Sequence, residues 1–139
     1  MEPLSVGVHS VRTIGGVKPE QIVAVFGAGP VGLLCLAVAK AMGAKRTIAI
    51  DIDQARLDFA KSYAATDIYL PPAKKEGETQ VDYSRRSAKE MMEKLQLTER
   101  GPNAVDLIIE ASGAAVCVQT GIFLVKPGGK TLRVIHNIQ

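Results

Sequence analysis

The sequence predicts an α/β fold, a doubly wound parallel sheet of about five strands with helices on both faces. Short apolar runs rich in β-branched residues alternate with longer segments whose apolar residues repeat at helical spacing. Only 4% of the 139 residues are aromatic and Trp is absent, so Val, Ile, Leu and Ala must build the core. Alternation of this kind calls for parallel strands joined by crossover helices.

The first half of the chain alternates clearly. Three apolar runs are predicted strands: residues 22–27 (IVAVFG), 46–52 (RTIAIDI) and 67–70 (DIYL). One helix between them carries an apolar stripe of Val31, Leu34, Cys35, Val38 and Met42 and ends at Gly43, a plausible C-cap. The next helix starts near Asp53, a good N-cap residue, and presents Leu57, Ala60 and Ala64 on one face.

The second half resumes the pattern after a polar stretch. Residues 71–86 open with two prolines and have no periodicity, which predicts a long surface loop. A helix follows, with an apolar face of Ala88, Met91, Met92 and Leu95. The remaining predicted elements are a strand at 104–111, a helix at 114–126 stopped by Pro127-Gly128-Gly129, and a fifth strand at 131–136.

Composition restricts the class of protein. We expect one domain over 1–139, with 1–20 a lead-in segment and helix and 21–139 the βα units. The net charge of +3 comes from scattered residues, so no nucleic-acid partner is expected. No apolar run approaches a membrane span and no signal peptide is evident. Cys35 and Cys117 fit two small buried thiols, which suits a cytoplasmic protein.

A glycine-rich turn carries the chemistry. Gly27, Gly29 and Gly32 form the G-x-G-x-x-G pattern after a predicted strand and before a predicted helix, the context of a dinucleotide-binding Rossmann fold. Gly27 permits the tight turn, Gly29 leaves room for a pyrophosphate, and Gly32 lets the helix approach the strand. Pro30 fits the first helical turn, whose amides would face the phosphates.

An acidic residue completes this fingerprint. Asp51 stands 19 residues after Gly32, at the end of the second strand, where a carboxylate accepts both ribose hydroxyls of an adenosine. The same charge repels a 2′-phosphate, so the predicted cofactor is NAD rather than NADP. Arg56 could cover the adenine or ribose edge, or be a solvated helix residue. The alternative is a tight βα turn that binds nothing, with Asp51 capping the next helix.

No complete catalytic group is visible, and no catalytic residue is assigned. His9 and His136 lie at opposite ends of the chain without a partner at triad or ligand spacing. None of the three tyrosines is followed four residues later by Lys, so the pair used by short-chain dehydrogenases is missing. Nucleophile-elbow and phosphate-loop motifs are also missing.

Four segments resemble medium-chain, zinc-dependent polyol dehydrogenases, in their sorbitol and xylitol dehydrogenase branch: EPLSVGVHSV, VFGAGPVGLL, AIDIDQARLDFAKSYAATD and IIEASGA. The resemblance extends to Gly129. It implies oxidation of a secondary alcohol of a polyol to a ketose, with hydride passing to NAD. In that family a catalytic zinc polarises the oxygen.

The resemblance also implies site residues. Those implied to bind the cofactor are Gly27, Gly29, Pro30, Val31 and Gly32 at the pyrophosphate turn, Asp51, Ile52 and Arg56 near the adenosine, and Ser112 and Gly113 near the nicotinamide side. Glu2 matches a position at the zinc site. For the isolated chain we favour a solvated terminal glutamate there.

Two departures limit what the resemblance implies. The family's zinc-binding catalytic domain and its returning C-terminal segment are absent from the sequence, and one carboxylate cannot replace three protein ligands. We therefore expect this chain to bind no zinc and to be inactive alone. Ile135, His136 and Asn137 stand where a glycine-containing turn should lie under the nicotinamide, and the sheet stops before a sixth strand. A truncated product, a splice form and a partial gene model all remain open.

Other functions stay open as alternatives. A non-catalytic NAD-binding module would need the same glycine turn without a zinc domain. An S-adenosylmethionine-dependent methyltransferase shares a glycine-rich first turn but is disfavoured by the proline in GAGPVG and by the missing antiparallel strand. The expected partner is a small-molecule cofactor, joined by a polyol only when the missing domain is present. An open sheet edge also leaves pairing with a second copy open.

Overall fold

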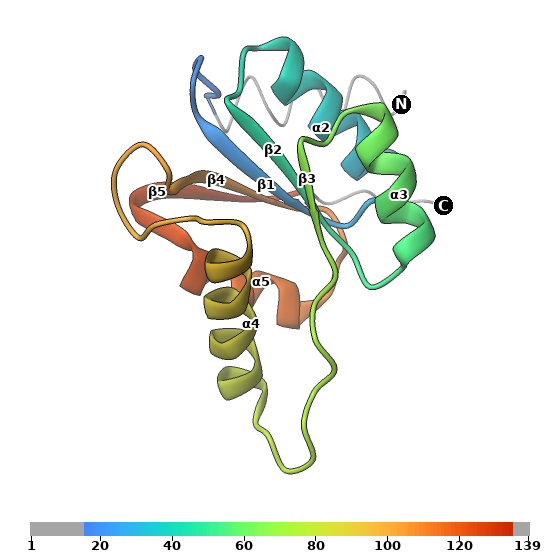
Figure 1. Cartoon of the computed structure of the whole chain (residues 1–139), viewed down its shortest axis with the longest axis vertical. Coiled ribbons are helices and arrows are strands. Elements are labelled where there is room, and N and C mark those ends of the chain that lie inside the picture. The colour runs from blue at the N-terminus through green and yellow to red at the C-terminus, as the bar shows by residue number, and fades with distance from the viewer. Residues whose placement is uncertain (1–15, 135–139) are drawn as a thin grey trace.

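The computed structural model describes residues 16–134, and they form an open parallel sheet in the order β3-β2-β1-β4-β5 (Figure 1). Each neighbouring pair of strands runs parallel. The strands are β1 (Ile22–Phe26), β2 (Arg46–Ile50), β3 (Asp67–Tyr69), β4 (Val105–Glu110) and β5 (Val125–Arg133). The predicted five-stranded α/β fold is confirmed.

Helices cover both faces of this sheet. They are α2 (Pro30–Ala41), α3 (Gln54–Tyr63), α4 (Gln80–Lys94) and α5 (Ala115–Leu124). Helices α2 and α3 pack on one face, and α4 and α5 pack together on the other (Figure 1). The fold is therefore doubly wound, as predicted. Within residues 16–134, every helix is too short or too polar to cross a membrane.

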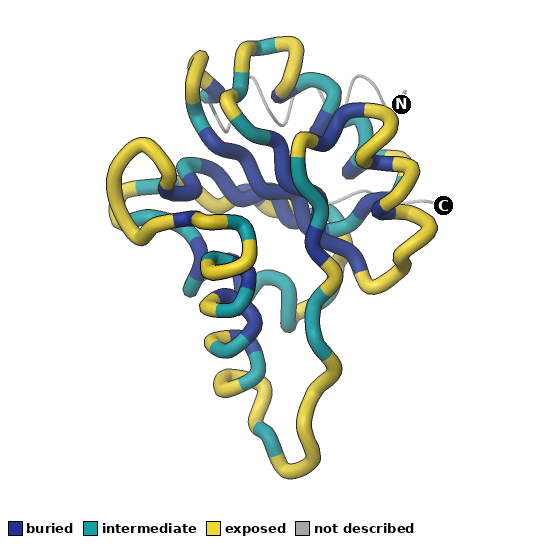
Figure 2. The backbone as a smooth tube through the Cα atoms, viewed as in Figure 1, coloured by how far each residue is buried: buried dark blue, intermediate teal, exposed yellow. Residues whose placement is uncertain are grey.

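The core consists of two apolar layers separated by the sheet. Because successive side chains of a strand point to opposite faces, Val23 and Val25 of β1 enter the layer under α2 and α3. Ile22, Ala24 and Phe26 enter the layer under α4 and α5. Every residue of β1 is buried, and the strand lies among the dark-blue segments at the centre of the molecule in Figure 2.

Two helix ends follow their sequence signals. Gly43 adopts a φ of +93° just after α2, where its N–H bonds the carbonyl of Lys40 at 3.0 Å. Asp53 caps α3, and its side chain accepts from the N–H groups of Ala55 and Arg56. Both capping predictions are confirmed.

The predicted face of α2 is partly wrong. Residues buried by the sheet are Gly32, Cys35, Leu36 and Ala39, whereas Leu34 is only half-buried and lies outside the core. The cause is Gly32, which brings the start of the helix against β1 and so sets which side of the helix faces inward.

The long loop predicted at 71–86 is also wrong in its second half. Helix α4 already begins at Gln80, because the side chain of Thr79 caps it and accepts from the N–H of Asp82 at 3.1 Å. Residues 70–79 extend away from the sheet below α4 (Figure 1). Tyr83 and Arg86 of α4 hold this segment by hydrogen bonds to the carbonyls of Pro72 and Ala73.

The fifth strand starts earlier than predicted. Strand β5 begins at Val125, directly after α5, and pairs there with Val105. Its register then shifts, and regular pairing resumes where Lys130 lies beside Leu107. Gly128, with a φ of +81°, lies in this irregular stretch. The glycines predicted to separate helix from strand are therefore an irregularity inside the strand.

Candidate functional site

The predicted site residues follow three neighbouring strands. Strand β1 lies between β2 and β4, so the chain leaves it in one direction to reach β2 and later crosses to β4 on its other side. This reversal is the place where ligands bind in open α/β sheets, at the carboxyl ends of the strands. The turns after β1, β2 and β4, with the first turns of α2 and α3, hold every predicted cofactor residue, so the fold brings them to one edge.

The three glycines differ in their surroundings. Gly27 has a φ of +102°, and a Cβ there would lie 3.0 Å from the backbone nitrogen of Ser112. A Cβ on Gly32 would lie 1.8 Å from the carbonyl oxygen of Gly27. A Cβ on Gly29 would meet no atom within 4 Å. Gly27 and Gly32 are thus required by packing, whereas Gly29 faces open space.

The start of α2 offers backbone amides to this space. Gly29 is the N-cap and supplies no side-chain cap, and proline stands in the first turn. Within the described chain, the N–H groups of Val31 and Gly32 have no backbone acceptor. Uncapped amides at the positive end of a helix dipole attract an anion such as a phosphate.

Asp51 joins the second strand to the glycine turn. Its side chain is only 6% exposed. Oδ2 accepts from the N–H of Ala28 at 2.8 Å, and Oδ1 accepts from the N–H of Asp53 at 2.9 Å. Each oxygen of a carboxylate can accept two hydrogen bonds, so one position on each remains.

Two neighbours of Asp51 border the same edge. The guanidinium of Arg56 is mostly exposed and approaches Asp51 Oδ2 at 4.0 Å. Ile52 is 86% exposed, an unusual setting for a large apolar side chain. Both side chains are free to contact a ligand, and Arg56 can turn toward solvent to uncover the carboxylate.

The turn after β4 depends on a residue that the sequence analysis missed. Glu110 is fully buried, and its Oε1 accepts from the N–H of Ser112 at 2.7 Å and of Gly113 at 2.9 Å. The hydroxyl of Ser112 also donates to this oxygen. The sequence feature that could have pointed to this role is an acidic residue at the end of an apolar strand, directly before Ala-Ser-Gly.

Cys35 is buried, whereas Cys117 is half-buried. Burial raises the pKa of the Cys35 thiol to about 11. Burial also raises the pKa of Cys117, and the negative charges of Glu110 and Asp51 add to that effect. Neither thiol has the lowered pKa of a reactive nucleophile. The expectation of two buried thiols is confirmed for Cys35 and only partly met by the half-buried Cys117.

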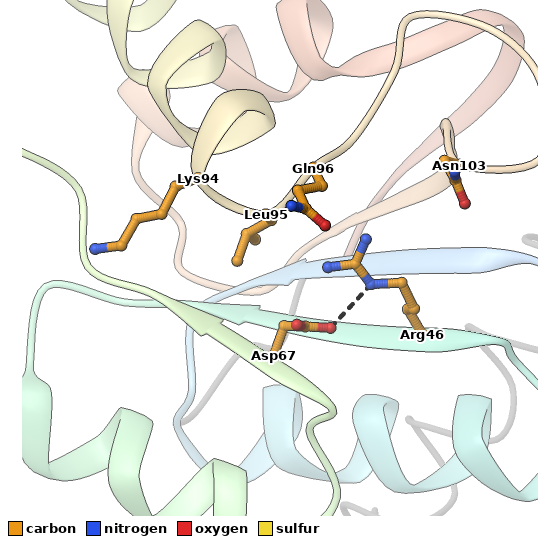
Figure 3. Close-up of a pocket in the computed structure, with 6 residues that line it drawn as sticks. All are labelled: Arg46, Asp67, Lys94, Leu95, Gln96 and Asn103. Atoms are coloured by element: carbon orange, nitrogen blue, oxygen red, sulfur yellow. Dashed lines mark hydrogen bonds and ion pairs between the residues drawn. The ribbon is translucent and has the colours of Figure 1, made fainter.

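A cavity of about 390 Å³ lies at the opposite edge of the sheet (Figure 3). Its walls include Arg46 and Asp67, which begin β2 and β3 and are joined at 3.0 Å. Burial raises the pKa of Asp67, but the hydrogen bonds from Arg46 and Thr66 outweigh it and leave the pKa below its usual value. This cavity is therefore separate from the glycine turn and contains none of the predicted site residues.

Several predicted features lie outside the described residues. These are Glu2, His9 and the tail residues Ile135, His136 and Asn137. Between residues 16 and 134, no group of three or more His, Cys, Asp or Glu side chains could hold a metal ion.

Comparison with known proteins identifies relatives. The sequence model of one family, described as zinc-binding dehydrogenase, matches residues 30–134. A probable D-xylulose reductase A of Aspergillus clavatus is 50% identical over 93% of this chain and 32% of its own length. The D-xylulose reductase A of Aspergillus oryzae is 48% identical over the same shares. The chain thus spans about one third of these relatives.

Solved structures of dehydrogenases also resemble this chain. An alcohol dehydrogenase of Thermus superposes with a TM-score of 0.72 at 30% identity, over 99% of this chain and 35% of that one. A putative zinc-binding dehydrogenase of Sinorhizobium meliloti, bound to NADP, gives a TM-score of 0.74 at 27% identity, over 96% and 34%.

Proposed function

Because this chain belongs to the zinc-binding dehydrogenase family, we propose that it is the NAD(H)-binding domain of a polyol dehydrogenase of the xylitol and sorbitol type. The enzyme would transfer hydride between a secondary alcohol and the nicotinamide. The similar proteins are named as a reductase and an alcohol dehydrogenase, which supports a dehydrogenase and not the methyltransferase alternative.

One observation carries the proposal: open amides and a carboxylate lie at the same edge of the sheet. The space beside Gly29 leaves the N–H groups of Val31 and Gly32 free to donate to a pyrophosphate. Asp51 holds the glycine turn through Ala28 and keeps acceptor positions for ribose hydroxyls. The bound nicotinamide would supply the hydride acceptor, and the chain's own residues bind and orient it.

The preference for NAD over NADP rests on charge. A 2′-phosphate beside Asp51 would be repelled by a carboxylate that has only 6% of its surface in water. Arg56 offsets part of this charge, but at 4.0 Å and mostly exposed it is a weak partner. The Sinorhizobium structure holds NADP, so cofactor identity in this chain has to be tested directly.

Zinc does not fit the described residues. Three protein ligands are needed for a catalytic zinc, and the described part of the chain gathers no such group. We derive no step through the metal. The proposal therefore assigns cofactor binding to this chain and leaves alcohol oxidation to a protein that also contains a zinc-binding domain.

Calorimetric titration of the 139-residue chain tests this function. NADH and ADP-ribose should bind, and failure of both at millimolar concentration would refute the proposal. Tighter binding of S-adenosylmethionine than of NADH would instead favour a methyltransferase.

Asp51→Ala should weaken NAD more than NADP, because the substitution removes both the ribose acceptor and the charge that repels a 2′-phosphate. Titration of NAD and NADP into the wild-type chain and into Asp51→Ala measures the ratio of the two affinities in each protein. Asp53→Ala is the matched control, since it removes a neighbouring carboxylate that caps α3 and lies 4.0 Å from Arg56 but accepts no hydrogen bond from the glycine turn. Equal losses of NAD and NADP affinity in Asp51→Ala would exclude the ribose role.

A further inference from the structure

A single buried carboxylate organises the turn after β4. Three donors from Ser112 and Gly113 converge on Oε1 of Glu110, whose side chain has no exposed surface. Burying a charged group is unfavourable unless hydrogen bonds or an opposite charge compensate it. Two of these donors are backbone N–H groups, so the carboxylate determines the path of the chain at Ser112.

The second oxygen of the same carboxylate is poorly satisfied. Within the described residues, Oε2 of Glu110 is buried and accepts no hydrogen bond. Its nearest cation is Arg133 of β5, whose Nε lies 3.7 Å away and whose side chain is mostly exposed. A buried acceptor without a donor lowers stability. The carboxylate is thus well satisfied at one oxygen and only weakly paired at the other.

The position of Glu110 links it to the glycine turn. Glu110 pairs with Phe26 of β1 and with Arg133 of β5, in the last row of the sheet before its carboxyl edge. The backbone of Ser112 then comes so near Gly27 that a Cβ on the glycine would lie 3.0 Å from the Ser112 nitrogen. The turn after β4 and the glycine turn are therefore packed against each other, and Glu110 holds one of them.

We propose that Glu110 is a positioning residue for the dinucleotide: it holds Ser112 and Gly113 against the glycine turn and so preorganises the binding surface. This inference rests on the proposed function. Preorganisation matters because a loop that must become ordered on binding reduces the affinity. Glu110 itself touches no ligand, since both of its oxygens are buried below the turn.

Strand β4 offers a matched control at its other end. Asp106 lies on the same strand, and its Oδ2 accepts from the backbone N–H of Ile22 at 2.8 Å. It also has a cationic neighbour in β5, Lys126. Asp106, with 11% of its side chain exposed, is a less buried carboxylate that also bonds a backbone N–H and a cation, but it lies at the amino edge, away from the glycine turn.

The test compares Glu110→Gln with Asp106→Asn in the 139-residue chain. Both variants should lower the midpoint of thermal unfolding. Only Glu110→Gln should weaken NADH and ADP-ribose, by about tenfold, because an amide in place of the carboxylate weakens the charge-assisted hydrogen bonds from Ser112 and Gly113. Glu110→Ala should weaken them further where it folds, because the amide oxygen of Gln can still accept from these donors whereas alanine cannot.

Amide hydrogen exchange supplies a second readout. Ser112 and Gly113 are exposed residues, but their N–H groups should exchange slowly in the wild-type chain and faster in Glu110→Gln, without cofactor present. Unchanged affinity in a folded Glu110→Gln protein would overturn the positioning role. Absence of binding by the wild-type chain would instead refute the proposed function.

Discussion

Gly29 and Gly32 stand three residues apart and meet opposite surroundings. The first faces open space, whereas the second allows the start of α2 to touch the backbone of Gly27. Both belong to one sequence motif, but one position is suited to contact a ligand and the other is needed to build the fold. Substituting each with alanine separates these two requirements.

Gly32→Ala should destabilise the chain by about 3 kcal/mol, because its Cβ would lie 1.8 Å from a backbone oxygen that cannot move without displacing β1 or α2. Gly29→Ala should change the free energy of unfolding by less than about 1 kcal/mol, since its φ of −78° suits alanine and its Cβ meets no atom. The same methyl should nonetheless reduce NADH affinity. Urea unfolding and calorimetry measure the two effects, and equal stabilities of the two variants would contradict this assignment.

Among single residues, some roles were predictable and others were not. The need for positive φ at Gly27 and the place of Asp51 follow from the motif and its spacing, because both depend on local sequence. Glu110 was missed because an acidic residue at a strand end usually turns to solvent. Its side chain instead folds back onto the N–H groups two and three residues later, at a strand end that lies between β1 and β5.

The segment 70–79 and helix α4 form a linked pair of elements. Arg86 donates to both carboxylate oxygens of Glu78 at 2.8 Å, and Lys75 donates its backbone N–H to the same side chain at 3.0 Å. These hydrogen bonds, first that from Arg86 and then that from Lys75, lower the pKa of Glu78 to about 2. This bidentate pair adds to the hydrogen bonds from Tyr83 and Arg86 to backbone carbonyls that hold the segment against the helix.

Acid should weaken this link in a defined range of pH. The folded pKa of Glu78 lies below the unfolded value, so its contribution to stability is complete above the unfolded pKa of about 4.3 and is lost as pH falls toward about 2. The difference in urea midpoint between wild type and Glu78→Gln should therefore be constant from pH 7 to 5 and shrink between pH 4.5 and 2. A difference that is unchanged at pH 3 would argue against the pairing.

Elements were predictable where the signal was local. The strands and the starts of α2 and α3 follow from apolar runs, proline and capping residues. The start of α4 was missed because Gln80 to Arg86 have no apolar period, and the cap at Thr79 with the contacts of Tyr83 and Arg86 supplies the stability instead. The early start of β5 depends on pairing with Val105, which no local pattern records.

The whole molecule is organised by a sheet that separates two apolar layers. Ile109 of β4 points into the layer under α2 and α3, and Ile48 of β2 points into the layer under α4 and α5. Both side chains have no exposed surface. The two isoleucines therefore lie in different apolar layers, and strand β1 separates β2 from β4.

Ile48→Val and Ile109→Val should each cost about 0.5–1.5 kcal/mol, because each removes one buried methyl group. The double variant should lose the sum of the two within about 0.5 kcal/mol, since distant sites without shared partners behave independently. Urea unfolding of the four proteins measures this cycle. A larger coupling energy would show that the two layers respond together through the sheet.

The strand order β3-β2-β1-β4-β5 also has a consequence for the protein during its synthesis. The ribosome releases β1, β2 and β3 in succession, but the other side of β1 stays unpaired until β4 emerges, 84 residues after Phe26 at Glu110. At about 5–20 residues per second this interval lasts roughly 4–17 s. For that time one edge of this apolar strand has unpaired backbone N–H and C=O groups. We therefore expect the incomplete sheet to bind a chaperone.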